Sequence, residues 1–514
     1  MLVILDGWGI TQPYSGNAIS QADTPNMREF VAKYPSTTLR ASGEAVGLPW
    51  GESGNSEVGH LNFGLGRILY QDLPRINKAI SDNSFYKNKS LLKAFAHAKK
   101  HKTNLHLIGL VSNGGVHASI EHLQALTVFA KNEGIKQVYL HVILDGRDTP
   151  YNSGVNFIKD IERFSSEYGN IAKIATLSGR FYAMDRDNHW DRVSKAYAVM
   201  TEGKGNKAAN AIEALEASYK KKIYDEEFAP TVIGDAALIS EKDAVIFFNF
   251  RADRARQLTK AFVLPGFDKF PRPKYLDLFF VCFTEYEKDL PIEVAFFPEE
   301  PKNTLGEVIA NAGLKQLRIA ETEKYAHVTY FFNGGREKKS KGEEHALVPS
   351  PRVDSYDLKP EMSANELTDR LIKEIESGKY DFILVNYANS DMVGHTGNIQ
   401  ATIKAVEAVD KCLGRIAKSV LPKGGCIIIS ADHGNAEEVF NMQTGMIDKE
   451  HSANPVPFIL MEKQFEGRKL GGMDAPGGDL SLVQPQGILS DVAPTILKIM
   501  NLERPEEMTG RSLL

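Results

Sequence analysis

Four short motifs, widely separated in the chain, carry side chains that bind divalent metal ions. They are Asp6-Gly-Trp-Gly, Asp391-Met-Val-Gly-His395, Asp432-His433-Gly-Asn and His451-Ser-Ala-Asn-Pro. A fifth motif, Gly54-Asn-Ser56-Glu-Val-Gly-His, places a hydroxyl group in a glycine-rich turn. Three aspartates, three histidines and a serine are enough to build a two-metal centre that transfers a phosphoryl group to a serine. We therefore treat the five motifs as one candidate site.

Asp6, Asp432 and His433 closely follow apolar stretches that are typical of strands. In an open α/β sheet, ligands are commonly bound where strands end at their carboxyl side. For Asp6 alone, a turn or a helix cap remains an equal alternative. Asp432 and His433 lack a packing motive, because burying either side chain without a partner is costly. Metal binding is therefore the favoured interpretation for these two residues.

Asp391 and His395 are four residues apart, so on a helical turn they face the same way and can share one ion. A polar loop is the alternative for this pair. His451 taken alone would be a surface histidine. Its inclusion depends on the strand expected directly after it, at residues 457–461, which we expect to join the same sheet.

Ser56 lies where a turn enters a helix-like stretch. One interpretation makes it a helix N-cap, with Glu57 merely solvated. The other makes it a nucleophile, because helix N-terminal amides stabilise an anion and a bound cation lowers the pKa of a hydroxyl group. The segment alone leaves both interpretations open.

Basic turns in the middle of the chain call for an anionic partner. Bidentate guanidinium groups suit phosphate and carboxylate oxygens, and the arginines concerned are Arg147, Arg180, Arg186, Arg251 and Arg254. Arg251 and Arg254 are three residues apart, so on a helix they can project from one face. His117 ends a glycine-rich turn and could bind phosphate, and Asp148 is a candidate general base. Separate surface ion pairs are the alternative, but several such turns at strand ends favour a shared anion site.

The elements that position these residues alternate between strand-like and helix-like stretches, which predicts an α/β fold with largely parallel sheets. The periodicity predicts helices over 363–378 and 399–420. It predicts strands over 2–5, 105–111, 138–144, 172–177, 244–250, 278–283, 382–385, 426–430 and 457–461.

The length of 514 residues predicts two domains. The metal-type motifs fall at both ends of the chain, and the basic turns fall between them. This distribution predicts a discontinuous domain, made of residues 1–71 and 300–514, with a second domain inserted at 76–296. The two crossings between the domains would form a hinge.

The composition is that of an ordinary soluble globular protein, with 42% hydrophobic and 25% charged residues. A net charge of −5 argues against a nucleic-acid-binding protein. Cys282, Cys412 and Cys426 lack metal-site spacing and predict free thiols in a reducing compartment. We find no signal peptide and no apolar run of about 20 residues that could span a membrane. We therefore expect a cytoplasmic protein without a membrane partner, and a monomer by default.

On these motifs the chain closely resembles the cofactor-independent (2,3-bisphosphoglycerate-independent) phosphoglycerate mutases of the alkaline phosphatase superfamily. The resemblance covers essentially the whole length. It also includes Ser112-Asn-Gly-Gly-Val-His117, Asp145-Gly-Arg-Asp148, Asn249-Phe-Arg251-Ala-Asp-Arg254 and Lys324-Tyr-Ala-His. It implies an alkaline-phosphatase-like domain interrupted by an inserted substrate-binding domain, with 3-phosphoglycerate and 2-phosphoglycerate as substrate and product.

The resemblance also implies a role for each motif. One metal ion would be bound by Asp391, His395 and His451, and the other by Asp6, Asp432, His433 and the hydroxyl oxygen of Ser56. Ser56 would become phosphoserine, Lys324 would contact it and the phosphoryl group, and Asp148 would move a proton between the two substrate hydroxyls. The substrate would be held by His117, Arg147, Asp148, Arg180, Arg186, Arg251, Arg254 and Lys324.

Mixed imidazole and carboxylate ligands favour two Mn²⁺ ions over Mg²⁺, which prefers oxygen ligands and water. Zn²⁺ and Co²⁺ remain alternatives. The rival functions are a metal-dependent phosphatase or phosphopentomutase of the same superfamily and, from another class, a metal-stabilised binding protein without activity. Release of inorganic phosphate without isomerisation would indicate the phosphatase, and metal binding without phosphoserine formation would indicate the binding protein.

Overall fold

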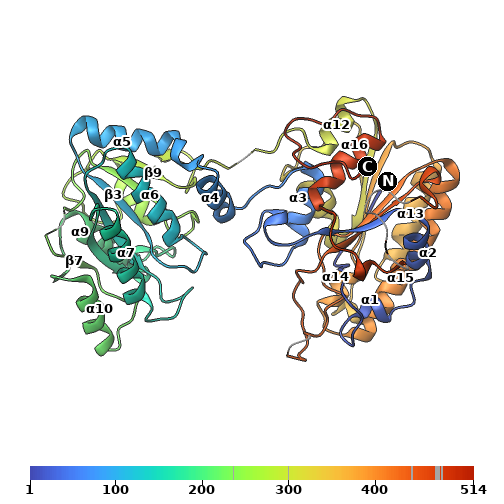
Figure 1. Cartoon of the computed structure of the whole chain (residues 1–514), viewed down its shortest axis with the longest axis horizontal. Helices are drawn as coiled ribbons and strands as arrows, with labels where there is room; N and C mark the ends of the chain where they lie inside the picture. Colours follow the sequence, from blue (N-terminus) through green and yellow to red (C-terminus); the bar gives the residue numbers. More distant parts are fainter. Residues whose placement is uncertain (236, 299, 442–443, 469–474, 476–477) are drawn as a thin grey trace. The chain divides into compact units, whose positions relative to one another are not determined.

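The computed structural model describes the chain except for residues 236, 299, 442–443, 469–474 and 476–477. The chain forms two compact units (Figure 1). Unit 1 consists of Met1–Gln71 and Glu300–Leu514, and unit 2 consists of Asp72–Glu299. Each unit has its own sheet and its own hydrophobic core.

Unit 1 is built on an eight-stranded sheet in which β15 runs antiparallel to both of its neighbours and the other pairs are parallel. In sheet order the strands are β12 (Glu343–Val348), β11 (Gln316–Glu321), β13 (Phe382–Tyr387), β1 (Leu2–Leu5), β14 (Ile427–Ser430), β15 (Val456–Met461), β2 (Ser36–Arg40) and β16 (Gly487–Ile488).

The first strand of the chain, β1, lies in the middle of this sheet. Leu2 is paired with Leu384 of β13 on one side and with Ile428 of β14 on the other. All four residues of β1 are buried, as expected for a continuous apolar run in a parallel sheet that is covered on both faces. The N-terminal segment is therefore an internal part of unit 1.

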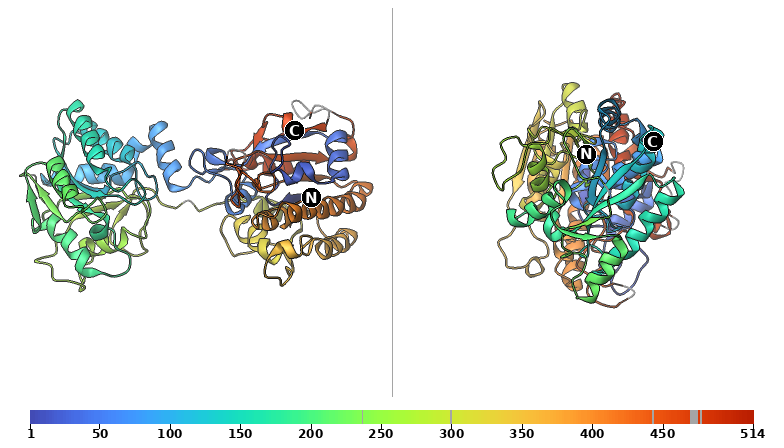
Figure 2. Two further views of the ribbon diagram at one scale, coloured as in Figure 1. Left: turned by 90° about the horizontal axis from the view of Figure 1, so that it is seen from below. Right: turned by 90° about the vertical axis from the view of Figure 1, so that its left-hand side faces the viewer.

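Helices cover both faces of the sheet of unit 1. The two long helices α13 (Ala364–Glu376) and α15 (Ile399–Val420) pack against each other, as Figure 2 also shows. On the other side, α3 (Ser56–Leu65) contacts α12 (Leu305–Asn311) and α16 (Val492–Ile499) (Figure 1). This arrangement leaves the carboxyl ends of the parallel strands as the edge from which functional loops extend.

Unit 2 is built on a second eight-stranded sheet, parallel except at the pair β5–β7. Its main helices are α5 (Lys89–His101), α6 (Ile120–Asn132), α7 (Gly154–Glu167), α9 (Trp190–Thr201), α10 (Ala211–Lys220) and α11 (Arg256–Val263). In sheet order its strands are β10 (Glu293–Val294), β9 (Phe279–Cys282), β8 (Ala244–Phe247), β3 (Leu105–Leu110), β4 (Val138–Leu144), β5 (Ala172–Gly179), β7 (Thr231–Ile233) and β6 (Asn206–Ala208).

The expected strands and the two expected helices are all present, with ends that differ by a few residues. The largest difference is at β8, which ends at Phe247. Arg251 and Arg254 do not project from one helical face, because both lie in the turn before α11 begins at Arg256. None of the helices described is both long and apolar enough to cross a membrane, and all three cysteines are free.

Candidate active site

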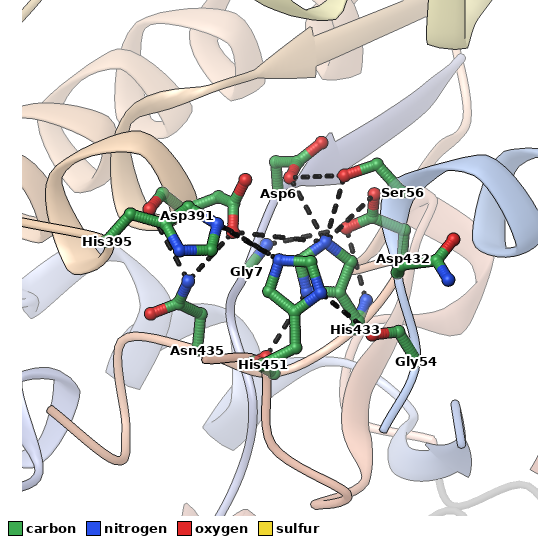
Figure 3. Close-up of polar contacts among 12 residues, drawn as sticks. Asp6, Gly7, Gly54, Ser56, Asp391, His395, Asp432, His433, Asn435 and His451 are labelled. Carbon is green, nitrogen blue, oxygen red and sulfur yellow. Dashed lines mark hydrogen bonds and ion pairs between the residues drawn. The ribbon is translucent and has the colours of Figure 1, made fainter. Parts of the chain in front are cut away.

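The metal-type motifs of unit 1 meet at the carboxyl ends of three adjacent strands. Asp6 follows β1, Asp391 lies in the short helix α14 (Asn389–Gly394) after β13, and Asp432 and His433 follow β14. All four side chains are buried. Figure 3 shows them converging together with Ser56, His395 and His451.

Asp391, His395 and His451 form the first group, which we call site A. The Nε2 atoms of His395 and His451 lie 3.2 and 3.3 Å from Oδ1 of Asp391, and 3.1 Å from each other. Their ligand atoms all lie within 4.8 Å of one another, close enough to hold one metal ion. The predicted pairing of Asp391 with His395 on one helical turn is present, since the His395 amide donates to the Asp391 carbonyl oxygen.

Asp6, Ser56, Asp432 and His433 form the second group, site B. The Ser56 hydroxyl lies 3.1 Å from Oδ1 of Asp6 and 2.9 Å from Nε2 of His433. His433 Nε2 is 3.4 Å from Asp6 Oδ1 and 3.8 Å from Asp432 Oδ2. The clusters compact enough for one ion combine Asp6 and His433 with Asp391, and Asp6 and Asp432 with His60. Sites A and B therefore adjoin through Asp391.

The imidazole orientations of both sites fit metal ligands. The Nδ1 atoms of His395, His433 and His451 lie 2.6, 3.2 and 2.9 Å from the backbone carbonyl oxygens of Lys449, Gly434 and Gly54. This contact makes Nδ1 the donor and turns Nε2 toward the carboxylates, which is the usual arrangement of a metal-bound histidine. Among the described residues, the buried Oδ2 of Asp432 has no hydrogen-bond partner; its nearest neighbours are the imidazole nitrogens of His60 at 3.2 Å and His433 at 3.8 Å.

The carboxylates give sites A and B a strongly negative electrostatic potential. Burial alone would lower the pKa of His433, but the carboxylates of Asp432 and Asp391 outweigh it and raise the pKa of His433 to about 10. The same charges raise the pKa of Lys324 above its ordinary value, although its burial acts in the opposite direction. Such a potential attracts divalent cations.

Lys324 joins both sites to the serine. It follows β11 in a short 3₁₀ turn and is buried. Its ammonium group donates to the Ser56 hydroxyl at 2.8 Å and to Asp391 Oδ2 at 2.6 Å, and it is 2.6 Å from Asp6 Oδ1. The sequence indicated this lysine only through the family resemblance, because a lone lysine after an unpredicted strand carries no local signal.

Three polar residues that we did not predict hold the ligands in place. Asn386, at the end of β13, donates to Asp6 Oδ2 at 2.8 Å and to His60 Nε2 at 3.1 Å. The Nδ1 atom of His60 lies 2.8 Å from the Ser56 carbonyl oxygen and 3.2 Å from Asp432 Oδ2. Asn435 donates to Asp391 Oδ1 at 2.9 Å. His60 and Asn435 belong to the quoted motifs, so their positions in those motifs were the available signal.

The glycines of the motifs allow these side chains to approach closely. Gly7 has a φ of +71°, and a Cβ atom there would lie 2.7 Å from the Cα of Asp391. A Cβ atom on Gly59 would lie 2.6 Å from the Cβ of Asp432. A larger residue at either position would push the aspartates apart.

Unit 2 gathers the predicted anion-binding residues at the ends of β3, β4, β5 and β8. The guanidinium group of Arg180 is buried and donates through one nitrogen to Asp145 Oδ1 and Asp148 Oδ2, both at 2.6 Å. We call the whole set the arginine cluster: His117, Arg147, Asp148, Arg180, Arg186, Arg251 and Arg254.

Asp253, which we did not predict, links the other side of the arginine cluster. Its carboxylate is 3.1 Å from Arg186, 3.2 Å from Arg251 and 3.7 Å from His117. Burial, followed by the charge of Arg180, lowers the pKa of His117 to about 4. Burial, followed by the charges of Arg186, Arg180 and Arg147, also lowers the pKa of Arg254. The cluster therefore carries an excess of positive charge suited to an anionic ligand.

Comparison with known proteins identifies the family. A family model described as the N-terminus of BPG-independent PGAM matches residues 76–288, and one described as type I phosphodiesterase / nucleotide pyrophosphatase matches residues 296–467. The 2,3-bisphosphoglycerate-independent phosphoglycerate mutase of Clostridium perfringens is 52% identical over 519 residues, covering 100% of this chain and 98% of that protein. The chain belongs to the 2,3-bisphosphoglycerate-independent phosphoglycerate mutases.

Other members of this mutase family are similarly close. One from Methanosarcina acetivorans is 52% identical over 520 residues, covering 100% of this chain and 98% of its own. The crystal structure of Leishmania mexicana phosphoglycerate mutase aligns with a TM-score of 0.52 and 31% identity, covering 99% of this chain and 96% of that chain. The expected α/β fold, with a discontinuous unit and a second α/β unit inserted in its sequence, is confirmed. The mutases of this family are isomerases.

Proposed function

We propose that the chain interconverts 3-phosphoglycerate and 2-phosphoglycerate without 2,3-bisphosphoglycerate, through a phosphoserine at Ser56. The contacts of the Ser56 hydroxyl are the observation that carries this proposal. It lies within 3.1 Å of Asp6, 2.9 Å of His433 and 2.8 Å of Lys324. The chain matches its curated relatives over essentially their full length, and their names support the same reaction.

We propose two metal positions. Asp391, His395 and His451 would hold one ion, and Asp6, Ser56, Asp432 and His433 the other. When bound, divalent cations would lower the pKa of the serine hydroxyl and offset charge on the transferring phosphoryl group. The mixed imidazole and carboxylate ligands support Mn²⁺ as the ion.

The residues of the chain account for each half of the reaction. The arginine cluster binds the carboxylate and phosphate groups of the substrate. Ser56, reacting as an alkoxide, forms a bond to phosphorus as the bond from phosphorus to the 3-oxygen breaks, and Asp148 gives the 3-oxygen a proton. After the glycerate turns, Asp148 takes the proton of the 2-hydroxyl, and the 2-oxygen takes the phosphoryl group from Ser56. Lys324 lies where negative charge develops in both steps.

This assignment gives the two units different tasks. Unit 1 would carry the nucleophile and the metal ions, and unit 2 would hold the substrate. We further propose that the protein is a cytoplasmic monomer. The free thiols of Cys282, Cys412 and Cys426 support a reducing compartment.

The test is a coupled assay for 2-phosphoglycerate, started from metal-stripped protein with added Mn²⁺ and without 2,3-bisphosphoglycerate. We expect turnover that depends on Mn²⁺. Ser56→Ala should abolish turnover, because it removes the hydroxyl group that accepts the phosphoryl group, while the variant still binds metal through the remaining ligands and its far-UV circular dichroism stays close to the parent's.

Two results would contradict the proposal. Substantial mutase activity in Ser56→Ala would exclude a phosphoserine at this residue. Release of inorganic phosphate by the parent without isomerisation would indicate a phosphatase instead.

A further inference from the structure

Glu437 is a buried acid close to the metal centre to which the proposed mechanism gives no role. Its side chain is 0% exposed, and it lies five residues after Asp432. Both carboxylate oxygens accept two hydrogen bonds. Oε2 accepts from the backbone amides of Gly9 at 3.0 Å and Asn435 at 2.9 Å. Oε1 accepts from the Ser452 hydroxyl and, at 3.0 Å, from Nδ2 of Asn454.

These four donors come from three separate loops, each of which carries metal-type residues. Gly9 belongs to the loop of Asp6, and Asn435 to the loop of Asp432 and His433. Ser452 and Asn454 follow His451 directly. The Ser452 amide also donates to the Gly434 carbonyl oxygen at 3.0 Å, which pairs two of the loops. One carboxylate is therefore the common anchor of loops from both site A and site B.

The fourth metal-type motif is connected through Asn435. While the Asn435 amide donates to Glu437, its side chain donates to Asp391 Oδ1 at 2.9 Å (Figure 3). A Cβ atom on Gly394 would lie 2.3 Å from Oδ1 of Asn435, so the helix of Asp391 packs directly on this side chain.

Two motif glycines are required by the position of Glu437. A Cβ atom on Gly9 would lie 2.2 Å from the Cδ of Glu437, and one on Gly434 would lie 2.3 Å from its Oε1. Side chains at these positions would displace the carboxylate from its donors. The second glycine of Asp6-Gly-Trp-Gly and the glycine of Asp432-His433-Gly are thus explained by contact with one buried acid.

We propose that Glu437 is a positioning residue that sets the spacing of the ligands of both metal sites without touching a metal ion. This proposal rests on the metal centre proposed above. Groups that orient metal ligands typically change metal affinity by about 10- to 100-fold when they are removed. Glutamine at this position keeps only one acceptor oxygen. Its amide nitrogen would face either the backbone amides of Gly9 and Asn435, which can only donate, or Nδ2 of Asn454 together with the Ser452 hydroxyl, which could turn to accept. Because the anchor is shared, Glu437→Gln should weaken both metal-binding steps, whereas loss of a ligand such as His395 should chiefly affect one.

The experiment is a Mn²⁺ titration of metal-stripped full-length protein, by calorimetry or by competition with a fluorescent chelator. We expect Glu437→Gln to weaken both steps by about 10- to 100-fold. The matched control is Glu376→Gln, which makes the same charge change at an exposed residue of the same unit and should bind Mn²⁺ like the parent. The electron paramagnetic resonance spectrum of bound Mn²⁺ should change in Glu437→Gln and not in the control. A residue that only stabilised the fold, without positioning the metal ligands, would leave this spectrum unaltered when substituted.

Binding of both ions by Glu437→Gln within threefold of the parent would overturn the inference while leaving the proposed function intact. Failure of the parent itself to bind Mn²⁺ would overturn both. If Glu437→Gln does not fold, Ser452→Ala removes a single donor and should weaken both steps in the same direction by a smaller factor. Unchanged binding in Ser452→Ala would then also overturn the inference.

Discussion

The ammonium group of Lys324 is close to two kinds of negative charge: the buried carboxylates and, during the proposed reaction, the transferring phosphoryl group. Its ammonium group lies between Asp6 and Asp391 and also contacts the Ser56 hydroxyl. Without metal ions, it offsets the repulsion between buried carboxylates. In the proposed reaction it also faces the charge that develops on the transferring phosphoryl group. Its effects on stability and on turnover should therefore be separable.

We predict that Lys324→Met destabilises the metal-free protein by about 3–5 kcal/mol, because it leaves buried carboxylates without their cation. Added Mn²⁺ should recover much of this loss, whereas turnover should stay about 100- to 1,000-fold below the parent's. Thermal unfolding with chelator and with Mn²⁺, together with the coupled assay, measures both effects. Lys315→Met, at an exposed position of the same unit, is the control, and equal losses with and without Mn²⁺ would contradict the prediction.

The individual residues of the site were predictable where several of them lie close together in a short sequence motif. Asp391 and His395 are close in sequence and face the same way as expected, and the adjacent Asp432 and His433 both contribute to the site. Asn386, Asp253 and Glu437 were not predicted. Each acts through contacts with distant segments, and an isolated Asn, Asp or Glu in a sequence is usually a solvated or capping residue.

At the scale of elements, the start of α3 decides where the nucleophile points. The N-cap is Asn55, whose side chain accepts a hydrogen bond from the Val58 amide at 3.0 Å. Ser56 is thus the first helical residue, and the interpretation of Ser56 as the cap is wrong. With the cap supplied by its neighbour, the Ser56 hydroxyl is free to contact Asp6 and His433.

We predict that Asn55→Ala lowers the free energy of unfolding by about 1 kcal/mol and also lowers kcat, because fraying of the first turn displaces the Ser56 hydroxyl. Thr304→Ala is the matched control, since Thr304 caps α12 of the same unit through a capping box. It should cost a similar stability and leave kcat unchanged. Denaturant unfolding and steady-state kinetics on both variants provide the comparison, and equal kcat values would refute the special role of α3.

Glu321 ends β11 and contacts the start of α13. Its carboxylate accepts from the Ser363 amide at 3.0 Å, and burial raises its pKa from an ordinary value of 4.5 to about 7. Between these two pH values the folded protein binds more protons at this group than the unfolded chain does. The contribution of Glu321 to stability therefore falls as the pH rises from 4.5 to 7, and stays low above that.

We predict that Glu321→Gln stabilises the protein at pH 8 relative to its effect at pH 5, by up to about 3 kcal/mol. Any constant cost of the amide cancels in the difference between the two pH values. The measurement is denaturant unfolding in the presence of chelator, with the exposed Glu376→Gln as the control. A pH-independent effect of Glu321→Gln would show that this carboxyl group titrates normally.

The sequence pattern predicted long and strongly periodic elements well, including α13 and α15. It missed β11 and β12, whose residues Gln316–Glu321 and Glu343–Val348 mix charged and apolar side chains. Arg318 in β11 is buried and lies against the rings of Phe332 and Phe382. A charged residue in a sequence suggests an exposed position, so the local pattern did not indicate a buried strand. Tertiary contacts determined these strands, and a propensity-based reading has no access to them.

At the scale of the whole molecule, the separate cores of units 1 and 2 imply two thermal transitions. We predict that chelation of the metal ions lowers only the transition of unit 1, which contains sites A and B. When the concentration of free metal ion is 100 times its Kd, binding of one ion stabilises the folded state by about 2.7 kcal/mol. Differential scanning calorimetry of the full chain, with Mn²⁺ and with chelator, measures the two shifts.

The transitions can be assigned with a core substitution in unit 2. Ile246 is a fully buried residue of β8. Ile246→Ala should lower the free energy of unfolding of unit 2 by about 2–5 kcal/mol, and so lower the temperature of the transition that Mn²⁺ does not shift. If Mn²⁺ shifts both transitions equally, the two units unfold as one.

The central position of β1 has a consequence for the order of events during synthesis. Leu2 pairs with Leu384 and Ile428, so its sheet cannot close until the ribosome has added more than 400 further residues. At about 5–20 residues per second, this takes roughly 20–90 s. All of unit 2 emerges during that interval and can fold first. Strand β1 therefore stays an unpaired apolar segment during most of that interval, and chaperones that bind such segments will find it there.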